Sequence, residues 1–144
     1  MEPISRKYLF FDLDGTLTDS MPGIARAVQY ALRRFGIDVQ DLAALKPFLG
    51  PPLRDSFMEF YGMSPEEADR AVAVSREYFV PRGMFENELY PGIPELLAST
   101  AAAGRVNVIA TSKPQPFAER IGTFIKLIMY LSGCVSNSEM VCSA

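Results

Sequence analysis

Two aspartates one residue apart, Asp12 and Asp14, are the side chains of this sequence best suited to chemistry. They follow an apolar run at residues 8–11 and precede Gly15, so a buried strand is predicted to end there in a tight turn. In strand-like geometry both carboxylates point to one side and Leu13 to the other. Two carboxylates so close repel each other unless a cation or a shared proton intervenes. The spacing therefore predicts a site for a hard cation such as Mg²⁺, held by oxygen ligands.

Composition excludes several rival chemistries. The 144 residues include no histidine, which excludes Ser-His-Asp triads, Cys-His pairs and HExxH zinc sites. Neither Cys134 nor Cys142 has an arginine six positions later, so a cysteine-phosphatase loop is excluded as well. We expect both to be free thiols, with a disulfide as the alternative. The sequence also has no P-loop and no GxGxxG motif, so phosphoryl chemistry would have to use carboxylates and a metal.

Charge and hydropathy limit the classes of partner that this protein is expected to bind. A net charge of −3 gives no reason to expect nucleic acid or an anionic membrane as a partner. The early apolar run is interrupted by Asp12 after four residues, so no secretory signal is expected. The apolar stretch at residues 127–135 is too short to span a bilayer. We therefore expect a cytoplasmic protein with one ordinary core and no membrane partner.

The segment FDLDGTLTDS at residues 11–20 resembles the first motif of the haloacid dehalogenase (HAD) superfamily. An EF-hand loop is excluded, because its glycine belongs at loop position six and its glutamate at position twelve. The resemblance implies that Asp12 is a nucleophile that takes up a phosphoryl group and that Asp14 is the general acid and base. It also implies that both hold Mg²⁺, Asp14 through its backbone carbonyl, and that Gly15 and Thr16 contact the phosphate.

The sequence pattern predicts the secondary-structure elements that must position this motif. A strand is predicted at about residues 8–12 and a turn at 13–20. Between this turn and Tyr90, the spacing of apolar residues and the positions of glycine and proline predict only helices. Ser64 with Pro65 and Glu67 is a strong helix start. The predicted helices cover residues 22–35, 41–45, 53–61 and about 65–80. This insert resembles the small helical cap (type C1) of HAD phosphatases, which implies a cap at 21–89 and a core at 1–20 and 90–144.

The second half of the chain supplies another strand end. A helix at 93–103 and a strand at 106–110 complete a βαβ crossover, so the strands are predicted to be parallel. Thr111, Ser112 and Lys113 follow that strand and resemble the second HAD motif, in the TSKP form seen in phosphoglycolate phosphatase-like members. They are therefore assigned to the phosphate. Arg54 matches a cap loop of related phosphatases and is a candidate for binding a substrate carboxylate or phosphate; a solvated helix-surface arginine is the alternative.

The family pattern is followed over residues 7–121 only. No third-motif lysine and no GDxxxD fourth motif are found, and the tail at 122–144 reads as unrelated to the sequence before it; a third strand near residues 125–131 is the alternative. The predicted fold is thus an α/β, Rossmann-like parallel sheet of the HAD type, incomplete, with an all-helical cap. Its first strand should have an open apolar edge.

These features predict a Mg²⁺-dependent phosphomonoester hydrolase, phosphoglycolate phosphatase-like, that acts on a small phosphorylated metabolite. A phosphosugar mutase of the β-phosphoglucomutase type and a non-catalytic truncated fragment are the alternatives. The substrate and the oligomeric state stay open. Because the carboxylates of Asp12 and Asp14 repel, replacing either by asparagine is expected to leave the melting temperature unchanged or raised without Mg²⁺.

Overall fold

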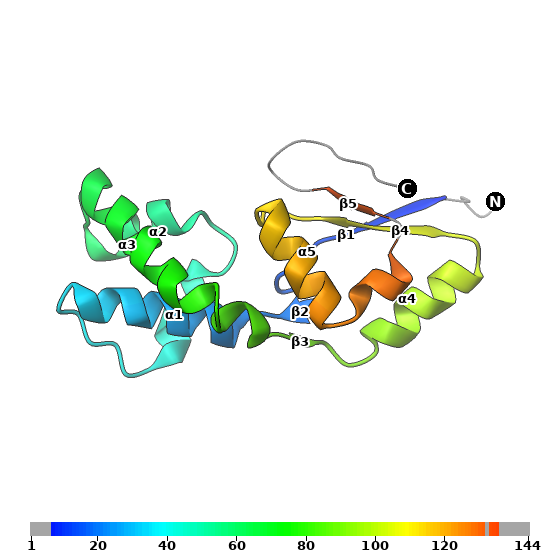
Figure 1. Cartoon of the computed structure of the whole chain (residues 1–144), viewed down its shortest axis with the longest axis horizontal. Coiled ribbons are helices and arrows are strands. Elements are labelled where there is room, and N and C mark those ends of the chain that lie inside the picture. The colour runs from blue at the N-terminus through cyan, green and yellow to red at the C-terminus, as the bar shows by residue number, and fades with distance from the viewer. Residues whose placement is uncertain (1–6, 132, 136–144) are drawn as a thin grey trace, which may run out of the picture. The chain divides into compact units, whose positions relative to one another are not determined.

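The computed structural model describes residues 7–131 and 133–135. The chain divides into two compact units. The sheet unit comprises the residues up to Asp19 and from Glu88 onward, and the helical unit comprises Ser20–Asn87. The predicted fold class, a parallel α/β sheet with an all-helical insertion, is confirmed (Figure 1).

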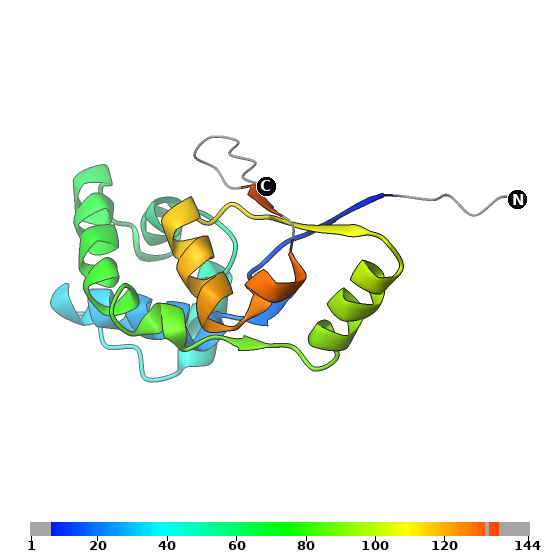
Figure 2. The same ribbon diagram turned by 45° about the vertical axis from the view of Figure 1, so that its right-hand side comes forward.

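The sheet unit is built on three parallel strands in the order β1-β4-β5. β1 spans Tyr8–Phe11, β4 spans Val106–Ala110 and β5 spans Gly133–Val135. Helices α4 (Ile93–Ala102) and α5 (Gln115–Phe124) lie on the same side of the sheet in Figures 1 and 2. A short 3₁₀ helix, η3 (Leu127–Tyr130), packs against both. The core beneath the sheet contains Leu97, Ile109, Ile121 and Leu127.

The strands alternate between a covered and an uncovered face. Parallel pairing sets Leu9 beside Asn107 and Phe11 beside Ile109, and these side chains are more buried than their neighbours along each strand. The alternate side chains of β1, Tyr8 and Phe10, are 53% and 64% exposed. Among the described strands β1 pairs only with β4. The expected open, apolar edge is therefore present.

The sequence did not predict the two-stranded antiparallel ladder of the sheet unit. β2 (Thr18–Asp19) pairs with β3 (Glu88–Leu89), where only a turn and a return segment were expected. Each strand has two residues, which is too short for hydrophobic alternation to be visible. The ladder holds together the two segments through which the chain leaves and re-enters the sheet unit.

The helical unit has three α-helices and two 3₁₀ helices in its described residues. They are α1 (Met21–Arg34), η1 (Leu42–Phe48), α2 (Leu53–Tyr61), α3 (Pro65–Phe79) and η2 (Gly83–Phe85). The predicted capping box at Ser64 is formed: its hydroxyl accepts the Glu67 N–H at 3.2 Å, and the Glu67 carboxylate accepts the Ser64 N–H at 2.9 Å. Val28, Leu32, Leu45, Phe48 and Phe57 form the centre of its core.

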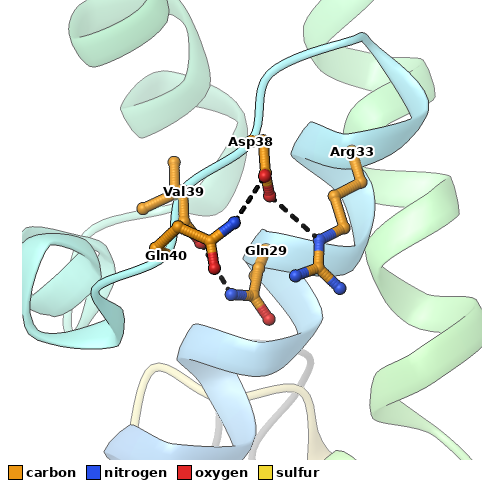
Figure 3. Close-up of polar contacts among 5 residues, drawn as sticks. All are labelled: Gln29, Arg33, Asp38, Val39 and Gln40. Atoms are coloured by element: carbon orange, nitrogen blue, oxygen red, sulfur yellow. Dashed lines mark hydrogen bonds and ion pairs between the residues drawn. The ribbon is translucent and has the colours of Figure 1, made fainter.

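The segment that follows α1 is tied back to that helix by side chains (Figure 3). Gln29 donates its amide to the carbonyl oxygen of Val39 at 2.7 Å. The Asp38 carboxylate accepts from the Arg33 guanidinium at 3.3 Å and from the Gln40 amide. These bonds fix the return of the chain toward η1.

The described part of the tail after α5 differs from the expected strand near residues 125–131. Residues 127–130 form η3 rather than a strand, and the third strand is β5 at 133–135, parallel to β4. A three-residue strand carries too little pattern to be located from sequence. Cys134 lies in β5; Cys142 lies outside the described residues, so the expected state of the cysteines is not tested.

Candidate active site

Asp12 lies one residue beyond the end of β1 and is exposed. Its Oδ1 accepts the backbone N–H of Leu13 at 2.8 Å, which orients the carboxylate. Leu13 itself is fully buried. The alternation predicted from the sequence thus anchors the strand end in the core and leaves the Asp12 carboxylate accessible.

Asp14 forms an ion pair with Lys113. The Lys113 Nζ lies 3.1 Å from Asp14 Oδ2, and the two side chains are only 9% and 16% exposed. Asp14 Oδ1 is buried and has no hydrogen-bond partner among the described residues. This carboxylate therefore has one oxygen fixed by a cation and one buried oxygen with no partner among the described residues.

The turn that separates the two aspartates from β2 is compact. The N–H groups of Thr16, Leu17 and Thr18 all converge on the Leu13 carbonyl at 3.0–3.3 Å. Gly15 has a positive φ of 77°, which a residue with a side chain adopts only with strain. Its N–H donates to the Thr18 carbonyl at 2.8 Å, and Gly15 and Thr16 are both exposed. The turn presents Thr16 to solvent beside the carboxylates.

The end of β4 contributes Thr111, Ser112 and Lys113. The register pairs Phe11 with Ile109, so Thr111 follows one residue beyond the position that faces Asp12. Thr111 Oγ1 accepts the Lys113 N–H at 3.2 Å, and Ser112 is exposed. The ion pair between Lys113 and Asp14 shows that the two strand ends meet. That pairing was not predicted, because the sequence analysis assigned Lys113 only to phosphate.

Arg54 lies at the start of α2 in the helical unit. Its Nε donates to Asp69 Oδ1 at 2.7 Å, and its Nη1 lies 3.7 Å from the Met58 sulfur. Both charged side chains remain exposed, which makes the pair a weak contributor to stability. A role for Arg54 toward substrate stays a prediction.

The donor atoms present are compatible with Mg²⁺. That ion binds proteins through one or two carboxylates and completes its shell with water and substrate phosphate oxygens. The exposed Asp12 carboxylate is an accessible oxygen ligand at this strand end, and the buried Asp14 Oδ1 is a polar atom there without a partner among the described residues. The described residues contain no cluster of three or more acidic, cysteine or histidine side chains placed to hold a metal.

Fold and site together define an α/β protein with paired carboxylates and a lysine at the carboxyl ends of parallel strands, where open α/β sheets bind ligands. Residues 9–141 match the model of the haloacid dehalogenase-like hydrolase family. The chain belongs to that family. The match extends about twenty residues past the point where the sequence analysis ended the resemblance, so that limit was wrong. β5 explains part of the extension, because it adds a third parallel strand inside the tail.

Three similar proteins illustrate the family. A 5′-nucleotidase of Pseudomonas aeruginosa is 50% identical over 113 residues, which are 78% of this chain and 51% of that protein. A phosphoglycolate phosphatase of Yersinia pseudotuberculosis is 32% identical over 91% of this chain and 59% of its own length. The crystal structure of a predicted phosphatase from Clostridium acetobutylicum is 48% identical, with a TM-score of 0.87, and is matched over 92% of this chain and 61% of that one. The chain thus spans between half and two thirds of the length of these relatives.

No helix within the part of the chain that the structure describes is both long and apolar enough to cross a membrane.

Proposed function

We propose that this protein is a Mg²⁺-dependent phosphatase that hydrolyses a small phosphomonoester through an aspartyl-phosphate intermediate. The observation that carries the proposal is the ion pair between Lys113 and Asp14, which joins the end of β4 to the turn after β1 beside the exposed Asp12. Relatives named phosphatase, phosphoglycolate phosphatase and 5′-nucleotidase support a hydrolase of phosphate esters.

In the proposed reaction the Asp12 carboxylate attacks phosphorus, and the bond to the ester oxygen breaks. Asp14 gives a proton to the departing alkoxide and later takes one from the water that attacks the aspartyl-phosphate. This attack releases inorganic phosphate and restores Asp12. Lys113 holds the Asp14 carboxylate in place, and Thr16 and Thr111 orient phosphoryl oxygens.

The Asp12 carboxylate and the Asp14 backbone carbonyl are the proposed Mg²⁺ ligands. When bound, Mg²⁺ supplies charge that offsets the repulsion between an anionic nucleophile and an anionic phosphate. The helical unit is the proposed cap, with Arg54 as its candidate contact to substrate; releasing Arg54 for that role requires its exposed bond to Asp69 to open.

The substrate class is tested with a small panel: phosphoglycolate, a nucleoside 5′-monophosphate and β-glucose 1-phosphate, each with Mg²⁺ and with EDTA. We expect Mg²⁺-dependent phosphate release from at least one of the first two. Conversion of glucose 1-phosphate to its 6-phosphate without net phosphate release favours the mutase instead. Absence of any turnover with the panel contradicts the proposal for this chain and favours the non-catalytic alternative.

The nucleophile is tested with Asp12→Asn against Asp41→Asn. Asp41 caps η1 by accepting the Ala43 N–H at 2.9 Å, a role that asparagine also fills. We expect Asp12→Asn to abolish turnover because an amide is a poor nucleophile, and Asp41→Asn to leave it unchanged. Near-normal turnover in Asp12→Asn rules out the proposed mechanism.

A further inference from the structure

Ser20 ends the FDLDGTLTDS motif, and the proposed reaction gives it no role. The chain passes between the two units next to this residue and again next to Asn87. The β2–β3 register pairs Thr18 with Leu89 and Asp19 with Glu88. Ser20 and Asn87 are the next residues of the two segments beyond the Asp19–Glu88 pair, and Ser20 is the N-cap of α1. Both residues therefore flank the same end of the ladder.

Both side chains are buried and polar, and neither has a partner. Ser20 is 3% exposed and Asn87 is 4% exposed. The Ser20 hydroxyl and both the oxygen and the nitrogen of the Asn87 amide lack a hydrogen-bond partner among the described residues. Buried polar atoms in native proteins are nearly always paired with protein or with ordered water.

Another buried asparagine of the same chain shows the ordinary arrangement. Asn107, 1% exposed, donates its Nδ2 to the Leu97 carbonyl at 3.0 Å and accepts from the Thr100 hydroxyl at 3.0 Å. The amide of Asn87 is equally enclosed but has neither bond. Among the described residues, Asn87 therefore lacks the kind of partners that satisfy Asn107.

The ladder itself is short, because it has only two residue pairs. Two-stranded ladders are marginally stable on their own, so a polar contact beside this one would help the two segments to stay paired.

We propose that Ser20 and Asn87 hold one buried water molecule between them, and that this polar latch keeps the two connecting segments paired. The Ser20 hydroxyl and the Asn87 amide supply three donor or acceptor atoms, which is the usual number of partners of a buried water. A water bridge also accounts for two buried polar side chains that are not bonded to each other. The latch is independent of the proposed phosphatase reaction.

The latch and the alternative of two unsatisfied groups predict opposite effects of mutation. If the groups are coupled through water, Ser20→Ala or Asn87→Leu alone leaves the other partner unsatisfied and weakens the ladder. The ladder of the double variant should then be no less stable than the ladder of either single variant. If the groups are simply orphaned, each apolar replacement removes a buried unsatisfied atom, so each should be neutral or stabilising and the two effects should add.

The test is amide hydrogen exchange of residues 17–20 and 87–90 in the 144-residue chain. We expect each single variant to accelerate exchange there about five- to tenfold, with the double variant within about twofold of the singles. Ser75→Ala is the matched control: Ser75 is a buried serine of the helical unit whose hydroxyl already donates to the Val72 carbonyl at 2.7 Å. The effects of Ser75→Ala and Asn87→Leu on the exchange rate should be additive.

Unchanged or slower exchange in both single variants, or additive effects in the double variant, overturns the latch. If Asn87→Leu does not fold, Ser20→Ala alone still decides: faster exchange supports the latch, and unchanged or slower exchange contradicts it. A high-resolution crystal structure of the unaltered chain gives a second decision. An ordered water contacting both Ser20 and Asn87 supports the proposal, and direct occupation of that space by protein atoms contradicts it.

Discussion

Lys113 Nζ lies 3.1 Å from Asp14 Oδ2, in a pair that is largely shielded from solvent. The two residues are 99 positions apart in the sequence, and they meet because β1 and β4 are adjacent and parallel. The contact changes the expected balance of charge at this strand end. The Asp14 carboxylate, which was expected to repel that of Asp12, also neutralises Lys113.

Asp14→Asn is therefore expected to lower stability, contrary to the expectation from the sequence. The substitution removes the carboxylate partner of a mostly buried ammonium, at a cost of about 2 kcal/mol, below the range for fully buried pairs. Turnover of an active form should fall roughly 10²–10⁴-fold. Urea unfolding measures the first effect. The double variant with Lys113→Met removes both charges and should recover part of the stability; no recovery contradicts a stabilising pair.

Gly23→Ala is expected to destabilise the helical unit by about 2–3 kcal/mol. A Cβ at Gly23 would clash with the Gly83 carbonyl oxygen, so α1 or η2 would have to move. Gly122→Ala is the control: it lies inside α5, and an added Cβ there meets no atom of the described residues within 4 Å. That change should stabilise by about 0.5–1 kcal/mol. Equal effects of the two variants on the melting temperature contradict the close approach.

Ser64→Ala should cost about 1 kcal/mol, because it removes the side-chain half of the capping box at the start of α3. Circular dichroism during urea unfolding is the measurement. Ser99→Ala, in the middle of α4, is the comparison, since that exposed hydroxyl donates only within its own helix. It should be neutral or slightly stabilising.

The pKa of Tyr78 is raised by burial and by the hydrogen bond that its hydroxyl donates to Glu86 at 2.7 Å. A raised folded-state pKa means that the folded protein keeps this proton at pH values where the unfolded chain has lost it. Its contribution to stability is thus complete below the unfolded pKa of about 10 and is lost as the pH rises through the folded value. Stability should fall above about pH 10, and Tyr78→Phe should flatten that fall. An unaltered pH profile in Tyr78→Phe contradicts the assignment.

Phe10→Lys is expected to reduce self-association without loss of fold. Phe10 is 64% exposed on β1, and β1 has one open edge among the described strands. An exposed apolar edge strand favours pairing with other chains, and a lysine there opposes it. Sedimentation velocity across a concentration series gives the readout. The control is Leu96→Lys, because Leu96 is exposed and lies away from the edge, whereas Leu97 is buried. Leu96→Lys should have little effect on self-association.

Local features determined much of this protein from sequence alone. The abrupt end of the apolar run at Asp12 located β1 and the carboxylate pair, because alternation and turn residues act over a few positions. The strand at 106–110 and the helix at 53–61 were predicted with their observed bounds. Ser64, Pro65 and Glu67 specified a helix start whose hydrogen bonds are local.

Tertiary structure decided what depends on segments far apart in the chain. The ion pair of Lys113 with Asp14 and the β2–β3 ladder both require strands to be brought together by long-range packing, and no local pattern encodes them. Arg54 could equally face a substrate or solvent by its sequence, and the fold gives it Asp69 as a partner. Ser20 and Asn87 differ from other buried polar residues, such as Asn107, because they lack a hydrogen-bond partner among the described residues, and this depends on what the folded chain packs around them.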